Sequence, residues 1–396
     1  MQFTAPATWE RKRIERYLAL AAILVMAVTA FLGLKRNNAD LEQVFSDVLP
    51  AAVRFEPLGN QSFAGYSANT ATSLIGYIKI SEADGYGGPL KVAVVIDPKG
   101  VISAVRVIEQ RETADYFKRV RSSELLHSLV GKGYQDELRL GDDVDGVSSA
   151  TFTSRAIVSA SRLGLRSIAS GELDLDVPRE ILPKVLFGVP ELVLILLIAV
   201  WYVGDRKGFQ LKRQARWFTL LTSMVFLGFL YTSLLTLPFI TKILMGFWPQ
   251  WQNSLYWYTL FGFFLLVFLI KGKNPYCQWI CPFGAVQETL GMIGGAKSRS
   301  PKRFAEFFRW LPRGLAFTAV LAALLFRNPG ISSYEVFGTL FDLEGSPFQF
   351  GLLGAVLISS FLIKRPWCRF LCPIGAIYDF LRTLRGLAKK RWRRTA

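Results

Sequence analysis

Histidine is nearly absent from this sequence of 396 residues, which contains a single histidine, His127. A haem b bound by two histidines therefore cannot be built from this chain alone, and oxidation of a quinol through such a haem would need another subunit. We expect His127 to be a solvated or packed residue of a helix. Cysteine is also scarce, and all four cysteines lie between residues 277 and 372. Any metal site must therefore draw on a small set of candidates.

Acidic residues are outnumbered, with 30 Asp and Glu against 47 Lys and Arg, which gives a formal net charge of +17. The basic residues cluster beside apolar segments, as at 11–13 and 391–394. This is the usual distribution of positive charge on the cytoplasmic side of a membrane, so we do not expect binding to nucleic acid. The hydrophobic content of 51% is too high for an ordinary soluble protein. We therefore expect a membrane protein in contact with lipid.

Six apolar segments are candidates for membrane-spanning helices, since a bilayer core of roughly 30 Å takes roughly 20 apolar residues. They are about Tyr17–Leu34, Lys184–Val203, Trp217–Phe239, Leu255–Ile270, Trp310–Phe326 and Phe350–Ile363. The first follows a basic stretch and lacks the small-residue pattern of a cleaved signal peptide, so we interpret it as an uncleaved anchor. Positive charge alternates between the loops that follow, which predicts that both termini are cytoplasmic.

The predicted fold class is a multi-domain membrane protein, with an α+β domain and a six-helix α-helical transmembrane region. The predicted divisions are 1–36 (cytoplasmic N-terminus and first anchor), 37–182 (polar extracytoplasmic domain), 183–273 (helices two to four), 274–309 (first cysteine motif and cytoplasmic loop), 310–364 (helices five and six) and 365–396 (second cysteine motif and basic tail). Within the polar domain we expect strands in 73–80, 91–96 and 101–110, with a turn at 97–100, and helices in 113–133 and 154–170.

The loop between those two helices reads Asp145-Gly146-Val147-Ser148-Ser149-Ala150-Thr151-Phe152-Thr153-Ser154. By residue type alone it is a loop with helix N-caps, since Ser, Thr and Asp accept backbone N–H bonds there. It also resembles the flavinylation motif of FMN-binding domains. Thr151 stands at the acceptor position, Asp145 at the acidic position, and Ser148 and Ala150 also match. Ser149 departs from the usual Gly, which would allow closer backbone approach.

This resemblance implies FMN that is covalently esterified to Thr151, and a separate flavin transferase that installs it from FAD with magnesium. The free N–H groups at a helix start would favour the flavin phosphate. The upstream stretch 85–113 resembles the strand and Glu-Thr region of the same domain. The residues that the resemblance assigns to the flavin site are Thr151, Asp145, Gly146, Ser148, Ser149, Ala150, Glu112, Thr113, Tyr86, Gly87 and Gly88.

All four cysteines lie in two copies of one pattern, Asn274–Ala285 and Arg365–Ala376, each with Cys, three residues, then Cys-Pro. Such an internal repeat could bring Cys277, Cys281, Cys368 and Cys372 together on the cytoplasmic side. Four thiolates match one iron–sulfur cluster, which we expect here, although the spacing is not the usual ferredoxin run. Zinc held by all four thiolates, structural thiols or a redox-active thiol pair are the alternatives.

The outer domain, the six helices and the twin motifs, in this order, resemble the NosR family, which includes NosR and PceC-type proteins associated with respiratory reductases. The resemblance implies an electron-transfer component of a bacterial inner membrane, with no catalytic residues of its own and with its FMN domain in the periplasm. Its partners would be an extracytoplasmic reductase or redox partner and a donor such as quinol or ferredoxin. Long members continue into a ferredoxin-like domain, whereas this sequence ends just after Arg394 and is expected to be a short form.

Two rival functions compete with electron transfer. A regulatory protein of the NosR type would sense redox state, but no kinase or DNA-binding domain follows the last apolar segment. A transporter would need helix breaks and buried polar sites, and the sequence shows little beyond Glu191. That residue is either an interfacial carboxylate near the membrane surface or a proton or quinol site.

Electron transfer has to cross a distance, because cytoplasmic thiols and an outer flavin would be separated by about the 30 Å bilayer core. A bound quinone, a second flavin, a partner or a swing of the domain could bridge it. The aromatic outer loops, with Tyr334, Phe337, Phe341 and Phe348, are candidates for docking the FMN domain near the membrane.

Overall fold

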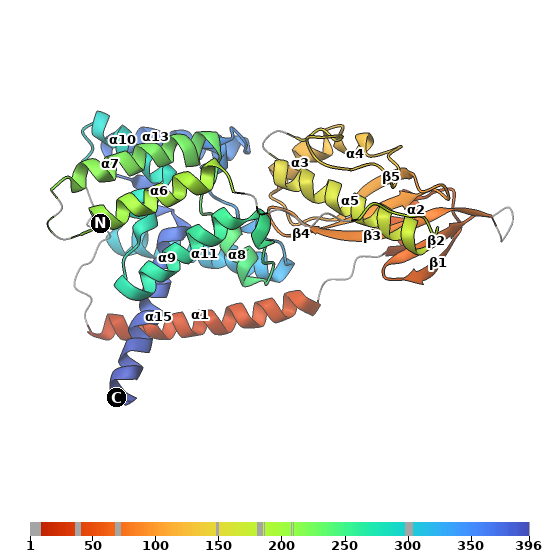
Figure 1. Cartoon of the computed structure of the whole chain (residues 1–396). Helices are drawn as coiled ribbons and strands as arrows, with labels where there is room; N and C mark the ends of the chain where they lie inside the picture. Colours follow the sequence, from red (N-terminus) through yellow and green to blue (C-terminus); the bar gives the residue numbers. More distant parts are fainter. Residues whose placement is uncertain are drawn as a thin grey trace.

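The computed structural model divides the chain into a β-sheet domain and a helical part (Figure 1). It describes residues 9–35, 41–67, 73–147, 150–179, 185, 187–206, 208, 210–297 and 304–395. Ser148 and Ser149 lie outside the described residues, and so does much of the basic loop after residue 297.

The sheet domain is built on five antiparallel strands in the order β1-β2-β3-β4-β5. These are β1 (Arg54–Gly59), β2 (Ser62–Tyr66), β3 (Leu74–Asp84), β4 (Pro89–Ile96) and β5 (Ile102–Glu109). The three predicted strands are present, and β1 and β2 precede them. The predicted turn closes β4 and β5, with Asp97 Oδ1 accepting from the N–H groups of Lys99 and Val101 and with Gly100 at a φ of +78°.

Both faces of this sheet are covered by helices, which are α2 (Leu41–Val48), α3 (Ala114–Arg121), α4 (Leu125–Ser128) and α5 (Thr151–Gly171). On β4, Val92 and Val94 pack into the cluster that contains α5. Ala93 and Val95 pack instead with residues of α2. Since alternate residues face opposite sides of a strand, burial on both sides explains why β4 is a continuous apolar run. The α+β class of this domain is confirmed.

The helical part contains most of the remaining elements. They are α1 (Trp9–Lys35), α6 (Val189–Gly204), α7 (Lys212–Thr222), η1 (Ser223–Leu230, a π-helix), α8 (Leu237–Leu244), η2 (Trp251–Asn253), α9 (Leu255–Lys271), η3 (Tyr276–Ile280, a π-helix), α10 (Pro282–Ile293), α11 (Ala305–Phe326), η5 (Pro329–Ser332), α12 (Phe337–Phe341), α13 (Pro347–Leu362), α14 (Pro366–Phe370) and α15 (Pro373–Thr395). Helix α1 runs along the outside of this part, with its C-terminal end toward the sheet domain (Figure 1).

The prediction of one continuous helix over Trp217–Phe239 is wrong. The helical stretch of α7 and η1 ends at Leu230, and α8 begins only at Leu237. Pro238 cannot donate a backbone hydrogen bond and its ring crowds the preceding turn, so it suits the start of a helix and disfavours a helix that continues through it. Thr236 caps α8 by accepting from the N–H of Phe239. The segment 231–236 is therefore an unwound connection.

Two of the described helices are long and apolar enough to cross a membrane, namely Arg13–Lys35 within α1 and Ala305–Phe326. Helices α6, α9 and α13 are apolar but shorter. Large apolar side chains of α1 are exposed, including Leu24 and Leu34, as lipid contact requires. These features indicate a membrane protein, and the full set of six spans stays a prediction. Glu191 lies at the start of α6, where its Oε2 accepts from the N–H of Gly188 at 2.8 Å.

Candidate functional site

Thr151 is the first residue of α5 and its side chain is exposed. The residue before it, Ala150, is the N-cap and supplies no side-chain acceptor. The first N–H groups of a helix have no intrahelical partner, and the helix dipole concentrates positive charge there. The start of α5 thus offers free donors beside an accessible hydroxyl, which suits a phosphate ester. Asp145 and Gly146 lie in the loop that leads to this point.

Two further loops meet beside Thr151. One joins β3 to β4 and carries Tyr86, Gly87 and Gly88, and the other leaves β5 and carries Glu112. Glu112 Oε2 accepts from the N–H of Gly87 at 3.1 Å. Gly87 has to be glycine, because a Cβ there would lie 2.1 Å from the Arg111 carbonyl oxygen.

One aromatic contact and one polar interaction connect these loops to α5. The ring of Tyr86 lies 6.3 Å from that of Phe152, the neighbour of Thr151. The side chain of Thr153 lowers the pKa of Glu112, an interaction that the sequence did not single out. Thr113 is the N-cap of α3 and makes no side-chain cap bond.

Glu112 is the buried charge of this site. Its burial raises the pKa of the carboxyl to about 6, while the N–H of Gly87 and the charge of Lys242 oppose the rise. Its second carboxylate oxygen, Oε1, is buried and has no hydrogen-bond partner among the described residues. A buried acceptor beside a free helix start fits the hydroxyl-bearing chain and the phosphate of FMN.

The flavin-site loops are docked onto the helical part. Lys242 of α8 donates to the carbonyl oxygens of Gly85 at 2.6 Å and Tyr86 at 2.9 Å. The Arg111 guanidinium lies over the ring of Phe247, 4.5 Å from its centroid. Arg119 of α3 forms an ion pair with Glu344. The candidate flavin site therefore lies at the junction of the two parts.

The aromatic residues predicted to dock the domain are placed differently. Tyr334, Phe337 and Phe341 pack in the core of the helical part, and Phe348 is exposed. The outer loops do meet the domain, but through Glu344 and through Gly330, which lies against the backbone of Glu112.

The second cysteine of each motif begins a helix. Cys281 is the N-cap of α10, and its Sγ accepts from the N–H of Gly284 at 3.4 Å. Cys372 precedes α15 and receives the equivalent bond from Gly375. Cys-Pro-x-Gly thus has a physical role, because proline fits the first helical position and the sulfur satisfies a free donor.

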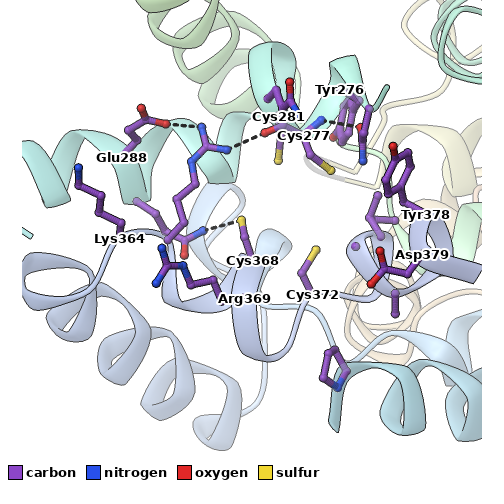
Figure 2. Close-up of a pocket in the computed structure, with 18 of the residues that line it drawn as sticks. Tyr276, Cys277, Cys281, Glu288, Lys364, Cys368, Arg369, Cys372, Tyr378 and Asp379 are labelled. Atoms are coloured by element: carbon purple, nitrogen blue, oxygen red, sulfur yellow. Dashed lines mark hydrogen bonds and ion pairs between the residues drawn. The ribbon is translucent and has the colours of Figure 1, made fainter. Parts of the chain in front are cut away.

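The four thiols line one cavity of about 1620 Å³. Figure 2 shows Cys277 and Cys281 facing Cys368 and Cys372 across it. Among the described residues, no three His, Cys, Asp or Glu side chains are arranged to hold a single metal ion. A cluster is larger than one ion, and the spread of the four thiols around a cavity suits such a group.

The thiols are buried rather than activated. Burial raises the pKa of Cys281 to about 12, and it also raises the pKa of Cys277, Cys368 and Cys372. A reactive thiol pair needs a lowered pKa, so this environment disfavours that alternative. Bound iron would supply the positive charge that keeps such sulfurs deprotonated.

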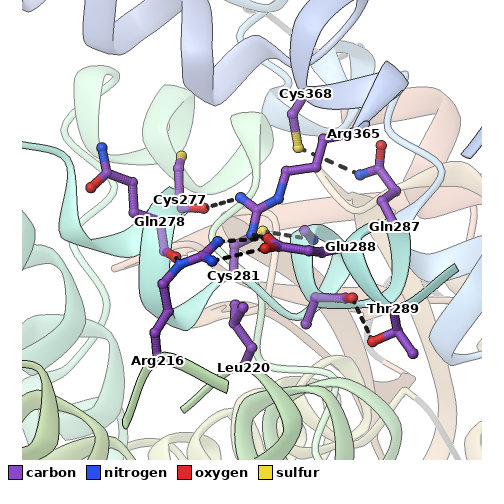
Figure 3. A network of polar contacts seen from close by, with 12 residues as sticks. Arg216, Leu220, Cys277, Gln278, Cys281, Gln287, Glu288, Thr289, Arg365 and Cys368 are labelled. Atoms are coloured by element: carbon purple, nitrogen blue, oxygen red, sulfur yellow. Dashed lines mark hydrogen bonds and ion pairs between the residues drawn. The ribbon is translucent and has the colours of Figure 1, made fainter. Parts of the chain in front are cut away.

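A polar network holds the two motifs together (Figure 3). Arg365 donates to the carbonyl oxygen of Cys277 at 2.7 Å and pairs with Glu288. Gln287 donates to Cys368 Sγ at 3.4 Å and accepts from the N–H of Trp367. The first motif is therefore bonded directly to the second.

The repeat also extends beyond the cysteines. Glu288 and Asp379 occupy the same place in the two copies. Arg216 of α7 binds Glu288 through two bonds of 2.8 and 2.6 Å, and Arg313 of α11 binds Asp379 at 3.1 Å. Sequence reasoning missed these pairs, although the equal spacing of the carboxylates was a readable signal.

Comparison with known families agrees with both sites. Residues 85–166 match the FMN-binding domain family, and residues 253–301 and 347–395 match a 4Fe-4S binding domain family. The first match contains Thr151, Tyr86 and Glu112, and the second contains all four cysteines. The chain is thus a redox protein that combines a flavin-binding domain with a helical part that matches a 4Fe-4S binding family.

Whole proteins with similar sequences point the same way. The chain is 28% identical over 209 residues to Regulatory protein NosR of Pseudomonas aeruginosa, a match that covers 48% of this chain and 28% of NosR. It is 29% identical over 196 residues to Protein NirI of Paracoccus denitrificans, which covers 43% of this chain and 28% of NirI. The matches thus span less than a third of these relatives, and the resemblance to the NosR family is confirmed.

Among solved structures, NqrC of Shewanella oneidensis is similar at 20% sequence identity. The match covers 36% of this chain and 81% of that chain, with a TM-score of 0.24. A TM-score this low carries no conclusion about the fold.

Proposed function

We propose that this protein transfers electrons in a bacterial inner membrane, using FMN covalently bound to Thr151 and an iron–sulfur cluster bound by Cys277, Cys281, Cys368 and Cys372. The observation that carries the proposal is the position of the flavin-site loops, which are docked by Lys242 onto the same helical part that holds the four thiols. Bound FMN and a bound cluster would supply the one- and two-electron chemistry, which no side chain provides.

The protein's own residues hold these groups in place. The Thr151 hydroxyl is accessible to a flavin transferase, and the free N–H groups of α5 stabilise the phosphate once it is attached. Tyr86 and Glu112 define the wall of the site that faces the helical part. Around the thiols, Gln287 and the N–H groups of Gly284 and Gly375 donate to sulfur, which stabilises thiolate ligands.

The orientation in the membrane is part of the proposal. Six spans with cytoplasmic termini would put the FMN domain in the periplasm, where an extracytoplasmic reductase or redox partner would exchange electrons with it. The basic residues around the cysteine cavity support a cytoplasmic position for that end. Quinol or ferredoxin is the proposed donor.

The test of the proposal is the intact mass and in-gel flavin fluorescence of the full chain co-expressed with a flavin transferase. We expect the wild type and the Thr151→Ser variant, which keeps a hydroxyl, to carry covalent FMN, and Thr151→Ala to carry none. Arg155→Lys, at an exposed position near the start of α5, serves as a control for changes in this part of the helix. Flavin that stays attached in Thr151→Ala would contradict the assignment of the acceptor.

A further inference from the structure

A line of aromatic side chains begins at the flavin site and enters the helical part. Tyr86 packs against the core of that part, and its ring lies 6.5 Å from the ring of Trp257. Trp257 in turn lies 5.2 Å from Tyr256 in an edge-to-face arrangement. Trp257 and Tyr256 are 7% and 5% exposed, so this part of the line is shielded from solvent.

The line continues toward the thiols across the unwound segment 231–236. Tyr256 donates its hydroxyl to the carbonyl oxygen of Ser233 at 2.7 Å. The Tyr276 hydroxyl accepts from the N–H of Leu235 at 2.9 Å. Their backbone partners lie two residues apart, so the two tyrosine hydroxyls bind the same short segment.

Tyr276 completes the connection to the cysteines. It precedes Cys277 in the chain, lines the same cavity as the four thiols, and is 2% exposed. Figure 2 shows Tyr276 beside Cys277 at the wall of the cavity. The same cavity is lined by Leu235, so the unwound segment reaches the thiols as well.

This arrangement answers the problem of distance. Helix α9 has 17 residues and is therefore about 25 Å long. Tyr256 and Trp257 stand at its beginning, and Tyr276 follows its end. The aromatic line leads from the beginning of α9 to the residue that follows its end through buried side chains, so it needs no bound quinone, second flavin or domain movement.

We propose that Tyr86, Trp257, Tyr256 and Tyr276 form the electron path between FMN on Thr151 and the cluster bound by the four cysteines. The inference rests on the proposed function. One electron leaves a reduced iron–sulfur cluster and one arrives at oxidised FMN, or the reverse, and the four rings end in the state in which they began. Full reduction of FMN takes two such electrons and two protons, which water at the outer face supplies.

The chain offers a matched control for this path. Trp201 of α6 is also a buried tryptophan, 3% exposed, with an edge-to-face aromatic neighbour, Phe263, at 5.0 Å. It contacts none of the four residues of the line through a ring pair among the described residues. Trp257→Leu and Trp201→Leu therefore remove the same side chain with similar losses of packing, but only one of them interrupts the line.

The experiment uses full-length protein in detergent, loaded with both groups as checked by intact mass and iron content. Photoexcited flavin takes an electron from a nearby tyrosine or tryptophan, so transient absorption reports the line directly. We expect an indole radical signal in the wild type and in Trp201→Leu, and its loss in Trp257→Leu. After flash reduction of the cluster, flavin reduction should be roughly tenfold slower in Trp257→Leu than in Trp201→Leu, because a cavity replaces packed rings.

The outcomes separate the two proposals. Equal radical signals and equal rates in Trp257→Leu and Trp201→Leu would overturn the path and leave the proposed function intact. A wild type that takes up no covalent FMN or no iron would contradict the proposed function itself. If Trp257→Leu does not fold, Trp257→Phe decides, since it keeps a ring at this position and must still abolish the indole radical.

Discussion

Glu112 shows how one side chain serves both the packing of the sheet domain and the candidate flavin site. It is buried, its Oε2 accepts from the N–H of Gly87, and its Oε1 has no partner in the part of the chain that the structure describes. An unpartnered buried oxygen destabilises a fold unless something binds it. We therefore expect this carboxyl to affect stability in the absence of FMN.

Replacing Glu112 with Gln tests this effect through pH. The folded protein holds the proton of Glu112 more tightly than the unfolded chain, because burial raises the pKa from 4.5 to about 6. The free energy of unfolding should therefore fall by about 2 kcal/mol as pH rises from about 4.5 to about 6, and stay level above. In urea unfolding of flavin-free protein, the free energy of unfolding of Glu112→Gln should not decrease over this pH range, whereas that of the control Glu56→Gln, at an exposed position, should decrease as in the wild type. Identical profiles for wild type and Glu112→Gln would contradict the assignment.

At this scale, the residues that the sequence assigned to the flavin site came only from resemblance, and their role in binding flavin stays a prediction. Tyr86, Gly87 and Glu112 do meet beside Thr151. Thr153 could not be predicted, because one hydroxyl in a row of Ser and Thr residues looks like its neighbours, and only the fold selects the one that reaches Glu112.

Among the elements, those with a strong apolar pattern were predicted and those without one were missed. Strand β1 contains Pro57 and is largely exposed, so it has no buried face to read from the sequence. The break between η1 and α8 had a signal in Pro238, which the length of the apolar run outweighed. The cap positions of Cys281 and Cys372 follow from the Cys-Pro pair in each motif.

The two cysteine motifs should act as one site, because both face one cavity and Arg365 and Gln287 join them. Removing either pair, with Cys277→Ser and Cys281→Ser or with Cys368→Ser and Cys372→Ser, should abolish iron binding entirely in elemental analysis. The control Met292→Leu changes the cavity wall but no thiol. Half of the iron remaining in each double variant would indicate two separate sites, and zinc in the wild type would favour a structural metal.

For the whole molecule, the sequence predicted the order of the parts and left their docking open. The contacts that join them, such as Lys242 with Gly85, link residues far apart in the chain. The sequence around a buried lysine in a short apolar helix does not indicate which residues the lysine contacts, so a structure is needed to identify them.

Lys242→Met should loosen this docking, because it leaves the carbonyl oxygens of Gly85 and Tyr86 without their donor. We expect amide hydrogen exchange in the 85–88 loop to become about tenfold faster or more, since each unsatisfied buried group costs about 1 to 3 kcal/mol. The more exposed Lys271→Met is the control. Unchanged exchange in Lys242→Met would show that other contacts alone hold the domain.

The lysine contact also determines what kind of carrier this protein can be. A tethered domain that moves between two partners has to diffuse, and a more viscous solution slows that diffusion. A domain held against the helical part by Lys242, Arg111 and Arg119 does not need to diffuse between partners. Under the proposed function, the rate of electron transfer would be set by the separation of the two groups and by the packing between them, and it would not depend on the viscosity of the solution.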